Sequence, residues 1–503
     1  MSTRTLQQQR IYRLFEIFPG ASVWIALVLA VVLSFVAPVV AIIFILLFDL
    51  LWCFRVVLFV FYLAIAWRQF RKTSSIDWEA RLKTFPDAKT LFHVVMLPTY
   101  TEDISVIRAT LASLRTVRFP LSQMLIVLAG EERDGDRFLA NAEVIQKEFA
   151  GVFGALLCTI HPKNLPEEIP GKGSNMNWAG HRLQEYLDEQ GIAYPHVVVS
   201  AFDIDTIVHP QYFAYLSYLY LTSPEPTRAS YQPIALYANN IWESPAAVRV
   251  GAFGTTFWIM AELARRDHTI TFSSHSMPMQ ALVDVGFWEK DIVTEDSRIF
   301  HQCLRKYHGK YRVIPMYLPV SMDTVGVGGY IESLGRLYKQ VRRWAWSVEH
   351  FPYLLWYFAR DAETPLWIRI RLIWKEWEGR FSWATAPVIM FLMGRLPLYV
   401  ASQQGSELAL ITQAPFVLQW LMRIAMVGVL ASALLSFALL PPRPKHAPRW
   451  APLVMVLQWL LVPITFVVFG SIPALDAQTR LMLGKYLGFN VSAKRSFSKT
   501  RNV

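Results

Sequence analysis

The sequence predicts an α/β domain with a mostly parallel sheet, combined with α-helical transmembrane segments and interfacial helices. Of its 503 residues 54% are hydrophobic, and the mean hydropathy of +0.30 exceeds that of an ordinary soluble protein. Membrane-length apolar runs lie near both ends, with short apolar runs alternating with helical patterns between them. We expect a cytoplasmic N-terminus (1–20), a transmembrane hairpin (21–67), an α/β domain (83–350), interfacial helices (351–380), a C-terminal transmembrane region (381–475) and a cytoplasmic tail (476–503).

Residues 21–67 form the first apolar run, in which only Asp49 and Arg55 are charged. At about 1.5 Å per residue, a helix of this length crosses a hydrocarbon core of about 30 Å twice. We therefore predict a helical hairpin that turns between residues 38 and 50. A cleaved signal peptide is the alternative, but its apolar core is shorter and is followed by a small-residue cleavage site.

The net charge of +11 is gathered beside the apolar runs. The basic residues that flank the hairpin are Arg4, Arg10, Arg13, Arg68, Arg71 and Lys72. Basic flanks face the cytoplasm, so we expect an integral protein of the bacterial inner membrane with a cytoplasmic catalytic domain. This distribution argues for contact with the lipid bilayer and against a nucleic-acid partner. Three scattered cysteines argue against a disulfide framework or a zinc site.

The middle of the chain alternates between strand and helix patterns. Short apolar runs at residues 92–97, 124–129, 154–160 and 196–202 suit buried strands, and residues 104–114 have helical spacing. Such alternation predicts a mostly parallel sheet covered by helices on both faces. Ligands of these sheets bind beyond the carboxyl ends of the strands, and polar residues follow three of the runs directly.

The C-terminal third differs from the middle of the chain in its amino-acid composition. Residues 331–358 and 366–380 mix basic and aromatic side chains, as interfacial helices do. Apolar runs follow at 381–400, 414–440 and 451–472. Three full crossings after a cytoplasmic domain would place the basic tail outside. We therefore expect one run to be interfacial or re-entrant, with 381–400, which contains Arg395, and 451–472, which contains Pro463, as candidates.

Asp203 and Asp205 lie two residues apart at the predicted end of a strand. Asp205 can ligate Mg²⁺ or Mn²⁺ through oxygen while Asp203 supports the ribose or the metal, and such a cation neutralises a departing diphosphate. The alternative is a turn in which both carboxylates accept hydrogen bonds from backbone amides.

Thr294, Glu295 and Asp296 open a predicted helix. A carboxylate here can serve as the base that removes a proton from an attacking hydroxyl, and Asp296 is the candidate. Ordinary capping of the helix N-terminus is the alternative.

Gln340, Arg343 and Trp344 share one face of a predicted helix. Arginine can hold a phosphate through two hydrogen bonds, and tryptophan offers a flat apolar surface to a sugar ring. The alternative is an interfacial helix whose arginines and tryptophans only contact the membrane surface.

This ordered series resembles the family 2 inverting glycosyltransferases, in the branch of cellulose, hyaluronan and chitin synthases. The motifs are DxD at 203–205, TED at 294–296, QxxRW at 340–344, PTYTE at 98–102 and KGSNMN at 172–177. The resemblance covers about residues 92–350 and implies a GT-A fold, a UDP-sugar donor and Mg²⁺ or Mn²⁺. It implies Asp296 as general base beside Glu295, and Trp344 at the acceptor-binding mouth of a membrane channel. The residues that it assigns to the donor are Thr99, Tyr100, Glu102, Glu131, Lys172, Asp203, Gln340 and Arg343.

Three further segments bear on this resemblance. FNVSAK at 489–494 resembles the gating loop of bacterial cellulose synthases, which makes Ser492 and Lys494 donor-binding candidates; a basic tail without this role is the alternative. Glu131 and Glu132 stand where the family carries an aspartate that reads uracil, which leaves the base open. The acceptor-side motif of cellulose synthases corresponds at most to residues 272–276, where His275 is either an acceptor contact or a structural residue.

Three functions follow as hypotheses. The first is a processive synthase that extends a β-linked polysaccharide and exports it, with accessory export or regulatory subunits as possible partners. The second is the transfer of a single sugar to a lipid or polyprenyl phosphate. The third is a nucleotide-sensing or scaffold membrane protein with an inactive site. Sugar, linkage and acceptor depend on pocket shape, which the sequence does not report.

Overall fold

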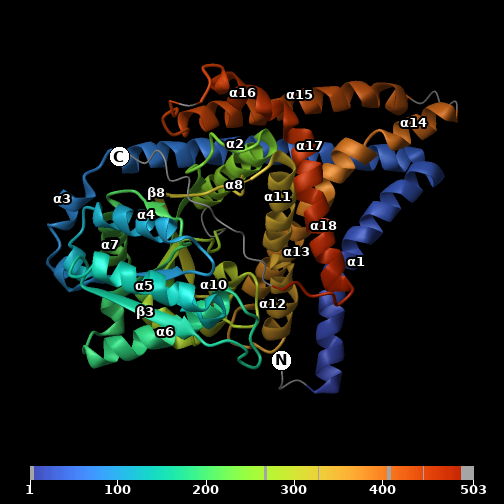
Figure 1. The fold of residues 1–503 in the computed structure, drawn as a ribbon. Coiled ribbons are helices and arrows are strands. Elements are labelled where there is room, and N and C mark those ends of the chain that lie inside the picture. Colours follow the sequence, from blue (N-terminus) through green and yellow to red (C-terminus); the bar gives the residue numbers. More distant parts are fainter. Residues whose placement is uncertain (1–4, 266–268, 327, 405–408, 446, 489–503) are drawn as a thin grey trace. The chain divides into compact units, whose positions relative to one another are not determined.

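The computed structural model describes residues 5–265, 269–326, 328–404, 409–445 and 447–488 (Figure 1). The chain divides into two compact units. The α/β unit comprises Ala66–Asn240 and Glu262–Val327, and the helical unit comprises Met1–Ile65, Ile241–Ala261 and Gly328–Leu487. The α/β domain expected from the sequence spans residues 83–350. In the structure, two parts of this span group with the membrane-type helices, residues 241–261 and 328–350.

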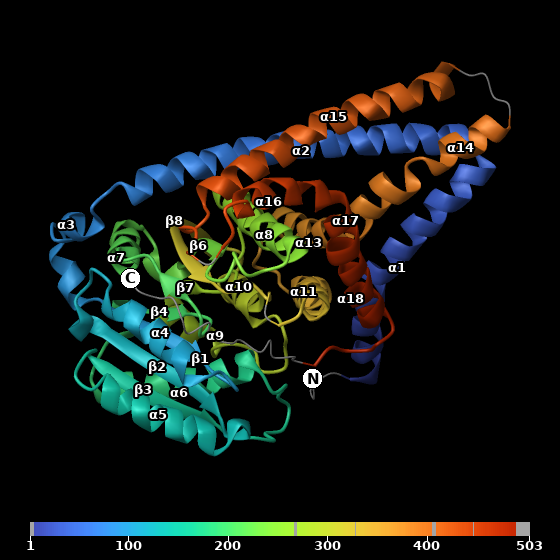
Figure 2. The same ribbon diagram turned by 45° about the horizontal axis from the view of Figure 1, so that its top comes forward.

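The α/β unit is built on a mixed sheet with the strand order β3-β2-β1-β4-β7-β6-β8-β5 (Figure 2). Its strands are β1 (Phe92–Pro98), β2 (Met124–Glu131), β3 (Ala155–His161), β4 (Val197–Ala201), β5 (Ile207–Val208), β6 (Ala229–Tyr237), β7 (His275–Pro278) and β8 (Arg312–Met322). β1 to β4 pair in parallel, and so do β6 and β8. β7 is antiparallel to both of its neighbours, and β5 is antiparallel to β8. The four strands predicted from apolar runs are confirmed as β1 to β4.

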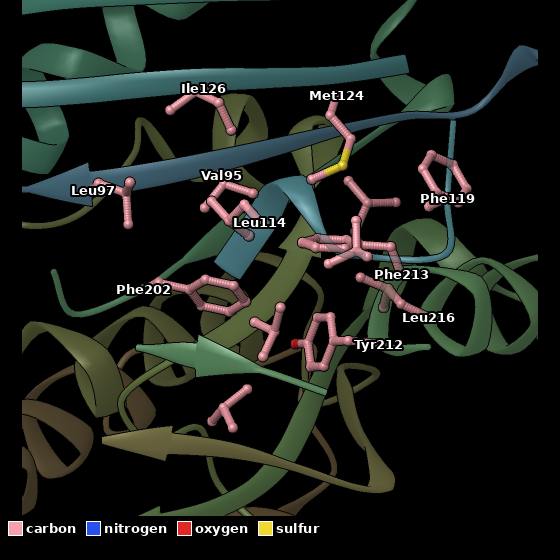
Figure 3. Packing of buried hydrophobic residues seen from close by; sticks show 14 of the residues in the cluster. Val95, Leu97, Leu114, Phe119, Met124, Ile126, Phe202, Tyr212, Phe213 and Leu216 are labelled. Carbon is pink, nitrogen blue, oxygen red and sulfur yellow. The ribbon is translucent and has the colours of Figure 1, made fainter. Parts of the chain in front are cut away.

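Helices cover this sheet. They are α3 (Trp78–Leu82), α4 (Ile104–Arg115), α5 (Asp136–Glu148), α6 (Lys172–Glu189), α7 (Tyr212–Thr222), α9 (Met279–Val285) and α10 (Glu295–Lys306). Alternate residues of a strand face opposite sides, so Val95 and Leu97 of β1 face one side, where they join Leu114 of α4 and Phe213 of α7 in one apolar cluster (Figure 3). α6 also contacts β1, β2 and β3, but none of its residues belongs to this cluster. The carboxyl ends of the central strands are thus held by cores on both sides.

The helical unit is built from helices that range from five to 37 residues in length. They are α1 (Leu6–Val36), α2 (Pro38–Ser74), α8 (Ala246–Ala264), α11 (Tyr330–Ala345), α12 (His350–Phe358), α13 (Leu366–Val388), α14 (Leu396–Gln403), α15 (Ala409–Ala438), α16 (Ala451–Leu457), α17 (Val462–Phe466) and α18 (Ile472–Met482). Within the described residues, five helical stretches are long and apolar enough to cross a membrane: Leu6–Val36, Pro38–Ser74, Leu366–Gln403, Ile411–Ala438 and Ala451–Met482. Their length and composition indicate an integral membrane protein.

The first two of these helices are separated at Ala37, one residue before the predicted interval. Ala37 has φ −143° and ψ 66°, outside the helical region. The residue before a proline disfavours helical dihedral angles, whereas proline suits the first position of a new helix. Pro38 therefore ends α1 and begins α2, and the helices extend beyond residues 21–67 on both sides.

The start of α1 and the end of α18 lie against each other. Arg13 donates to the carbonyl oxygens of Leu481, at 2.7 Å, and Met482, which satisfies acceptors that a helix end leaves free. Arg13 also pairs with the buried Glu16 at 2.8 Å. A Cβ atom on Gly20 would lie 2.6 Å from the carbonyl oxygen of Gln478. Only glycine therefore fits this contact, which we call the α1–α18 clasp.

Candidate active site

Lys172 is the centre of the polar cluster in the α/β unit. It is the first residue of α6, and its ammonium group lies 2.9 Å from Oδ1 of Asp296 and 3.0 Å from Oδ1 of Asp203. Glu295 is 3.5 Å from the same nitrogen. The Lys172 side chain is 10% exposed, and those of Asp203 and Asp296 are 29% and 22% exposed. One nearly buried cation therefore joins three carboxylates from two separate parts of the chain.

The electrostatics of Lys172 follow from this arrangement. Burial alone lowers the pKa of an ammonium group, but the charges of Asp203, Asp296 and Glu295 outweigh it and raise the pKa of Lys172 above its ordinary value. Lys172 is therefore protonated at neutral pH. Its positive charge offsets the mutual repulsion of the three carboxylates, which lets them lie close together.

Local sequence explains how α6 approaches α10. A Cβ atom on Gly173 would lie 3.0 Å from the carbonyl oxygen of Glu289 and 3.2 Å from the Cβ of Glu295. The absence of a side chain at this position brings Lys172 close to the start of α10. Asn175 links the first turn of α6 to the sheet, because its side-chain amide donates a hydrogen bond to the carbonyl oxygen of Ala129 near the end of β2.

The DxD aspartates have different surroundings. Asp205 is 4% exposed, and its Oδ2 accepts a hydrogen bond from the backbone N–H of Asp323 at 3.0 Å. Its own carbonyl oxygen accepts from Asn239 at 3.1 Å. Asp203 instead accepts from the hydroxyl of Ser273 at 2.6 Å in addition to its contact with Lys172. Asp203 thus belongs to the Lys172 cluster, while Asp205 is held by the backbone after β8.

The segment before β7 connects the two acidic motifs. The hydroxyl of Thr271 donates to the carbonyl oxygen of Asp296 at 2.5 Å, and Ser273 donates to Asp203. Ser274 has φ +62°, a left-handed conformation that is uncommon for a residue other than glycine. The hydroxyl of Ser274 lies 3.0 Å from that of Thr206. This strained turn therefore fixes the DxD and TED motifs in one place.

A second cluster follows β1 and β2. Glu102 accepts hydrogen bonds from the hydroxyl of Thr99 at 3.0 Å and from the backbone N–H of Tyr100 at 2.6 Å. The guanidinium of Arg133 lies 4.6 Å from the centre of the Tyr100 ring and forms an ion pair with Glu131. Burial raises the pKa of Glu131, and Arg133 opposes that rise. The four donor candidates at the ends of β1 and β2 are thus brought together.

The QxxRW residues belong to the helical unit. Gln340, Arg343 and Trp344 all lie on α11, on one face as predicted, and each is partly buried. Leu337 and Val341 of the same helix are buried. Arg342 forms an ion pair at 2.9 Å with Asp476 of α18. Ser492 and Lys494 lie outside the described residues.

The described residues include no group of three or more His, Cys, Asp or Glu side chains that could hold a metal ion. Mg²⁺ is commonly held by one or two carboxylates together with substrate phosphates and water. Asp205 is nearly buried and oriented by Asp323. With Asp203 it fits a divalent cation that arrives with a phosphate-bearing substrate, rather than a site formed by protein ligands alone.

Sequence reasoning missed several contacts of this site. Arg133 and Thr271 each touch a predicted residue but belong to no motif. Ser273 lies in the 272–276 segment, but its contact with Asp203 was not predicted. Arg133 follows Glu131 in the polar stretch after β2, which is a weak signal for it. The backbone N–H of Asp323 gives no signal in a sequence, because every residue except proline carries one.

A comparison with protein families shows the class of this chain. The profile of the family described as glycosyl transferase family group 2 matches residues 198–470, more than half of the chain. The comparison with curated proteins gives no match.

Solved structures that are similar to this chain include the following three. The mannosyltransferase PcManGT from Pyrobaculum calidifontis, in complex with GDP-Man and Mn²⁺, is 16% identical with a TM-score of 0.44, and the match covers 78% of this chain and 97% of that chain. S. aureus TarS 1-349, in complex with UDP-GlcNAc, is 12% identical with a TM-score of 0.36 and coverages of 79% and 93%. Glucosyl-3-phosphoglycerate synthase from Mycobacterium tuberculosis, in complex with Mn²⁺, UDP and phosphoglyceric acid, is 13% identical with a TM-score of 0.31 and coverages of 56% and 84%.

The predicted fold class, a GT-A α/β domain combined with membrane-type helices, is confirmed by the sheet, the five apolar helices and the family match. The chain belongs to glycosyl transferase family group 2 and is a glycosyltransferase.

Proposed function

We propose that this glycosyltransferase transfers a sugar from a UDP-sugar, with inversion, to a growing β-linked polysaccharide. The reaction is processive and coupled to export of the product. The proposal of sugar transfer is supported by the Lys172 cluster. In this cluster the ammonium group of Lys172 contacts both Asp203 of the DxD motif and Asp296 of the TED motif.

Asp296 is the general base in this proposal. The acceptor hydroxyl oxygen attacks the anomeric carbon, the bond from that carbon to the phosphate oxygen breaks, and the hydroxyl proton passes to the carboxylate of Asp296. Lys172 lies 2.9 Å and 3.1 Å from the two carboxylate oxygens of Asp296. Glu295, whose side chain is 4% exposed, adds negative charge 3.5 Å from the same nitrogen of Lys172.

The donor diphosphate lies beside Lys172 and the DxD motif in this proposal. Lys172 provides positive charge for the diphosphate, and Asp203 orients the ribose or the metal. A Mg²⁺ or Mn²⁺ ion held by Asp205 and Asp203 supplies further neutralisation of the leaving diphosphate when it is bound. Thr99, Tyr100, Glu102 and Glu131 hold the nucleoside, which their clustering supports.

The acceptor side involves residues of α11. Trp344 holds the acceptor sugar at the mouth of the channel, while Gln340 and Arg343 contribute to the donor. Their position on one face of a single helix supports this assignment. The acceptor is a glycan in this proposal. A lipid-linked acceptor is the alternative, and accessory export or regulatory subunits are further possible partners.

The α1–α18 clasp supports a cytoplasmic position for both ends of the helical unit. Because Arg13 near the start of α1 touches Leu481 at the end of α18, both helix ends lie on the same side of the membrane. The number of crossings between them is then even, so at least one of the five candidate stretches does not cross. Both candidates for the one interfacial or re-entrant run contain a π-helical segment, Ile389–Met393 and Val467–Ser471, and such segments interrupt a regular helix.

In this proposal the chain after α18 continues on the same side as the basic N-terminus, and Ser492 and Lys494 act on the donor there. Cysteines introduced at Gln8 and Lys485, in a variant without Cys53, Cys158 and Cys303, test it. We expect a membrane-impermeant thiol reagent to label both positions in inverted inner-membrane vesicles and neither in intact cells. Labelling of one position from each side would contradict the even number of crossings.

The purified full chain with radiolabelled UDP-glucose, UDP-N-acetylglucosamine, UDP-galactose and UDP-glucuronate tests the proposed function, with Mg²⁺ or Mn²⁺ present. We expect one donor to yield a long β-linked product on sizing. A product limited to one sugar on a lipid would contradict the polymer and support the second hypothesis. Absence of transfer from all four donors would contradict the proposed donors.

A further inference from the structure

Arg249 lies in the first turn of α8, in the helical unit, and is one of two buried arginines among the described residues, at 9% and 6% exposed. The other one, Arg298, forms an ion pair with Glu289 at 2.8 Å. The side chain of Arg249 instead makes a single hydrogen bond, from Nε to Oε1 of Gln458 at 2.6 Å. Burial lowers the pKa of Arg249, and no charge in the described part of the chain opposes this effect. Arg249 is therefore a buried cation without a counter-charge.

The surroundings of Arg249 make this charge costly. A charge removed from water is unfavourable unless an opposite charge or several hydrogen bonds replace the water. Arginine stays protonated in proteins and carries five N–H donors, of which only the one on Nε has a partner in the described residues. The N-terminal end of a helix also carries a partial positive charge, which disfavours a cation in the first turn. An anion at this place would remove both penalties.

The far end of the Arg249 guanidinium is accessible. Nη1 and Nη2 have no hydrogen-bond partner in the described residues, yet neither is among the fully buried side-chain atoms that lack one. Most of the side chain is therefore enclosed, while its two terminal nitrogens reach an accessible space. Gln458 is 3% exposed, and its amide nitrogen has the sulfur of Met455 as partner, at 3.8 Å. Because sulfur is a weak acceptor, this amide is a further donor at the site.

The segment that contacts Arg249 is basic and lacks carboxylates. Between Glu407 and Asp476 the sequence contains no acidic residue, and the basic residues in this interval are Arg423, Arg443, Lys445 and Arg449. The last three lie in the loop between α15 and α16. This loop touches the segment before α8, because Nε1 of Trp242 donates to the carbonyl oxygen of Pro441 at 3.1 Å. The loop therefore adds positive charge and no compensating anion.

An apolar surface continues from the same loop. Trp450, Leu453, Leu457 and Leu460 follow it and are exposed. They belong to or directly precede Ala451–Met482, one of the stretches that are long and apolar enough to cross a membrane. Basic side chains beside an exposed apolar surface suit an anionic lipid, since its phosphate is charged and its acyl chains are apolar.

We propose that Arg249 and Gln458 bind the phosphate group of an anionic membrane lipid. The loop between α15 and α16 contributes positive charge, and the exposed apolar residues after it contact the acyl chains. A guanidinium can hold two phosphate oxygens through parallel hydrogen bonds, and an anionic leaflet supplies such phosphates to basic segments beside membrane helices. The lipid provides the counter-charge that Arg249 lacks. This site is independent of the donor, the acceptor and the product of the enzyme.

Three substitutions separate a lipid site from a purely structural hydrogen bond. Arg249→Gln removes the charge. Gln458→Glu places a carboxylate oxygen where the amide oxygen already accepts from Arg249, so the protein itself supplies the missing counter-charge. Arg108→Gln is the matched control, because it removes the same charge from an exposed arginine whose partner, Glu148, is also exposed.

Thermal unfolding of the full chain, purified in a non-ionic detergent and freed of lipid, tests the missing counter-charge. Without lipid, Arg249→Gln should leave the Tm unchanged or raise it, because the wild type buries an uncompensated charge. Gln458→Glu should raise the Tm by pairing that charge. A Tm lowered by both substitutions would show that the contact between Arg249 and Gln458 is complete without an anion, and it would overturn the proposal.

Addition of short-chain phosphatidylglycerol to the same samples tests the ligand. A ligand that binds only the folded state raises the Tm as its concentration rises, and we expect this rise in the wild type and in Arg108→Gln. Loss of a hydrogen bond to a charged group weakens binding by about tenfold to 100-fold. Arg249→Gln and Gln458→Glu should therefore need at least about tenfold more lipid for the same rise. Equal responses of the wild type and Arg249→Gln, or no response at all, would contradict the site.

Two further additions identify the source of the phosphate. Phosphatidylcholine carries a phosphate but no net charge, so it should raise the Tm of the wild type less than phosphatidylglycerol does. Inorganic phosphate at the same concentration should leave the Tm unchanged. An equal rise with phosphatidylcholine would show that the site does not select an anionic lipid. A rise with inorganic phosphate that depends on Arg249 would assign the site to a soluble anion, and either result overturns the lipid. None of these measurements uses a sugar donor, so their failure leaves the proposed function intact.

Discussion

Nζ of Lys172 lies 2.9 Å from Oδ1 of Asp296, and the same nitrogen lies 3.0 Å from Oδ1 of Asp203. These two carboxylates are 93 positions apart in the sequence, and each belongs to a different acidic motif. A single ammonium group therefore holds the DxD and TED motifs together. Two predictions concern this contact directly.

Replacement of Lys172 by methionine removes the charge and keeps a long apolar side chain. We expect it to destabilise the α/β unit by about 3 kcal/mol, because a nearly buried group of carboxylates loses its counter-charge. Thermal unfolding in detergent measures the effect. Lys163→Met is the control: Lys163 forms an exposed pair with Glu132, and such pairs contribute at most about 1 kcal/mol. Equal effects of both substitutions would contradict a central role for Lys172.

The contact of Lys172 with the carboxylates also predicts how the stability of the protein depends on pH in the alkaline range. The folded state raises the pKa of Lys172, so its stabilisation is complete below the ordinary lysine pKa of about 10.4 and is lost only as pH rises through the folded value. The stability difference between wild type and Lys172→Met should therefore stay constant from about pH 7 to pH 9.5. A difference that shrinks within this range would show that Lys172 is not held by the carboxylates.

The burial of His93 predicts how the stability of the protein depends on pH in the acidic range. Burial lowers its pKa from 6.5 to about 3, so between these values the unfolded chain binds a proton that the folded chain excludes. Stability is therefore unaffected above pH 6.5 and falls below it, by up to about 1.4 kcal/mol per pH unit. His93→Gln should reduce this acid slope in thermal unfolding. The exposed His196 is the control, and His196→Gln should leave the slope unchanged; equal slopes in wild type and His93→Gln would refute the assignment.

Substitution of Gly20 tests how much the α1–α18 clasp contributes to stability. Alanine here places Cβ 2.6 Å from a carbonyl oxygen of Gln478 and 2.8 Å from the Cβ of Met482. We expect Gly20→Ala to cost about 1–3 kcal/mol through overpacking. Gly379 of α13 has open space at the same position, so Gly379→Ala should be neutral or stabilising by up to about 1 kcal/mol. Thermal unfolding of both variants measures these changes in stability. Gly20→Ala should lower the Tm and Gly379→Ala should not, and a Tm lowered equally by both would argue against the clasp.

The sheet could be predicted because its signal is local. Strands β1 to β4 are predominantly apolar runs of suitable length, and each is bounded by turn residues or by a helix start. The position of Asp203 directly after β4 followed from the same pattern. The start of α10 at Glu295 also agrees with the sequence, since Thr294 precedes it and acidic residues form its first turn.

The contacts of the site could not be predicted in the same way. Lys172 was assigned to the donor only through its motif, and nothing in the sequence indicates that it contacts both Asp203 and Asp296. Such contacts depend on the crossing of α6 and α10, which Gly173 permits. The clasp likewise joins residues more than 460 positions apart, Arg13 and Leu481. Packing between distant segments sets these distances, whereas periodicity and motifs describe only neighbours along the chain.

Transfer of radiolabelled sugar from the preferred UDP-sugar by Asp296→Asn, with Asp291→Asn as control, tests the central claim most directly. Asp291 is exposed in the loop before α10, so its variant should retain wild-type transfer. We expect Asp296→Asn to reduce transfer by at least about 100-fold, because the amide cannot take the proton from the acceptor, while UDP binding persists. Transfer at the wild-type rate by Asp296→Asn would contradict the account.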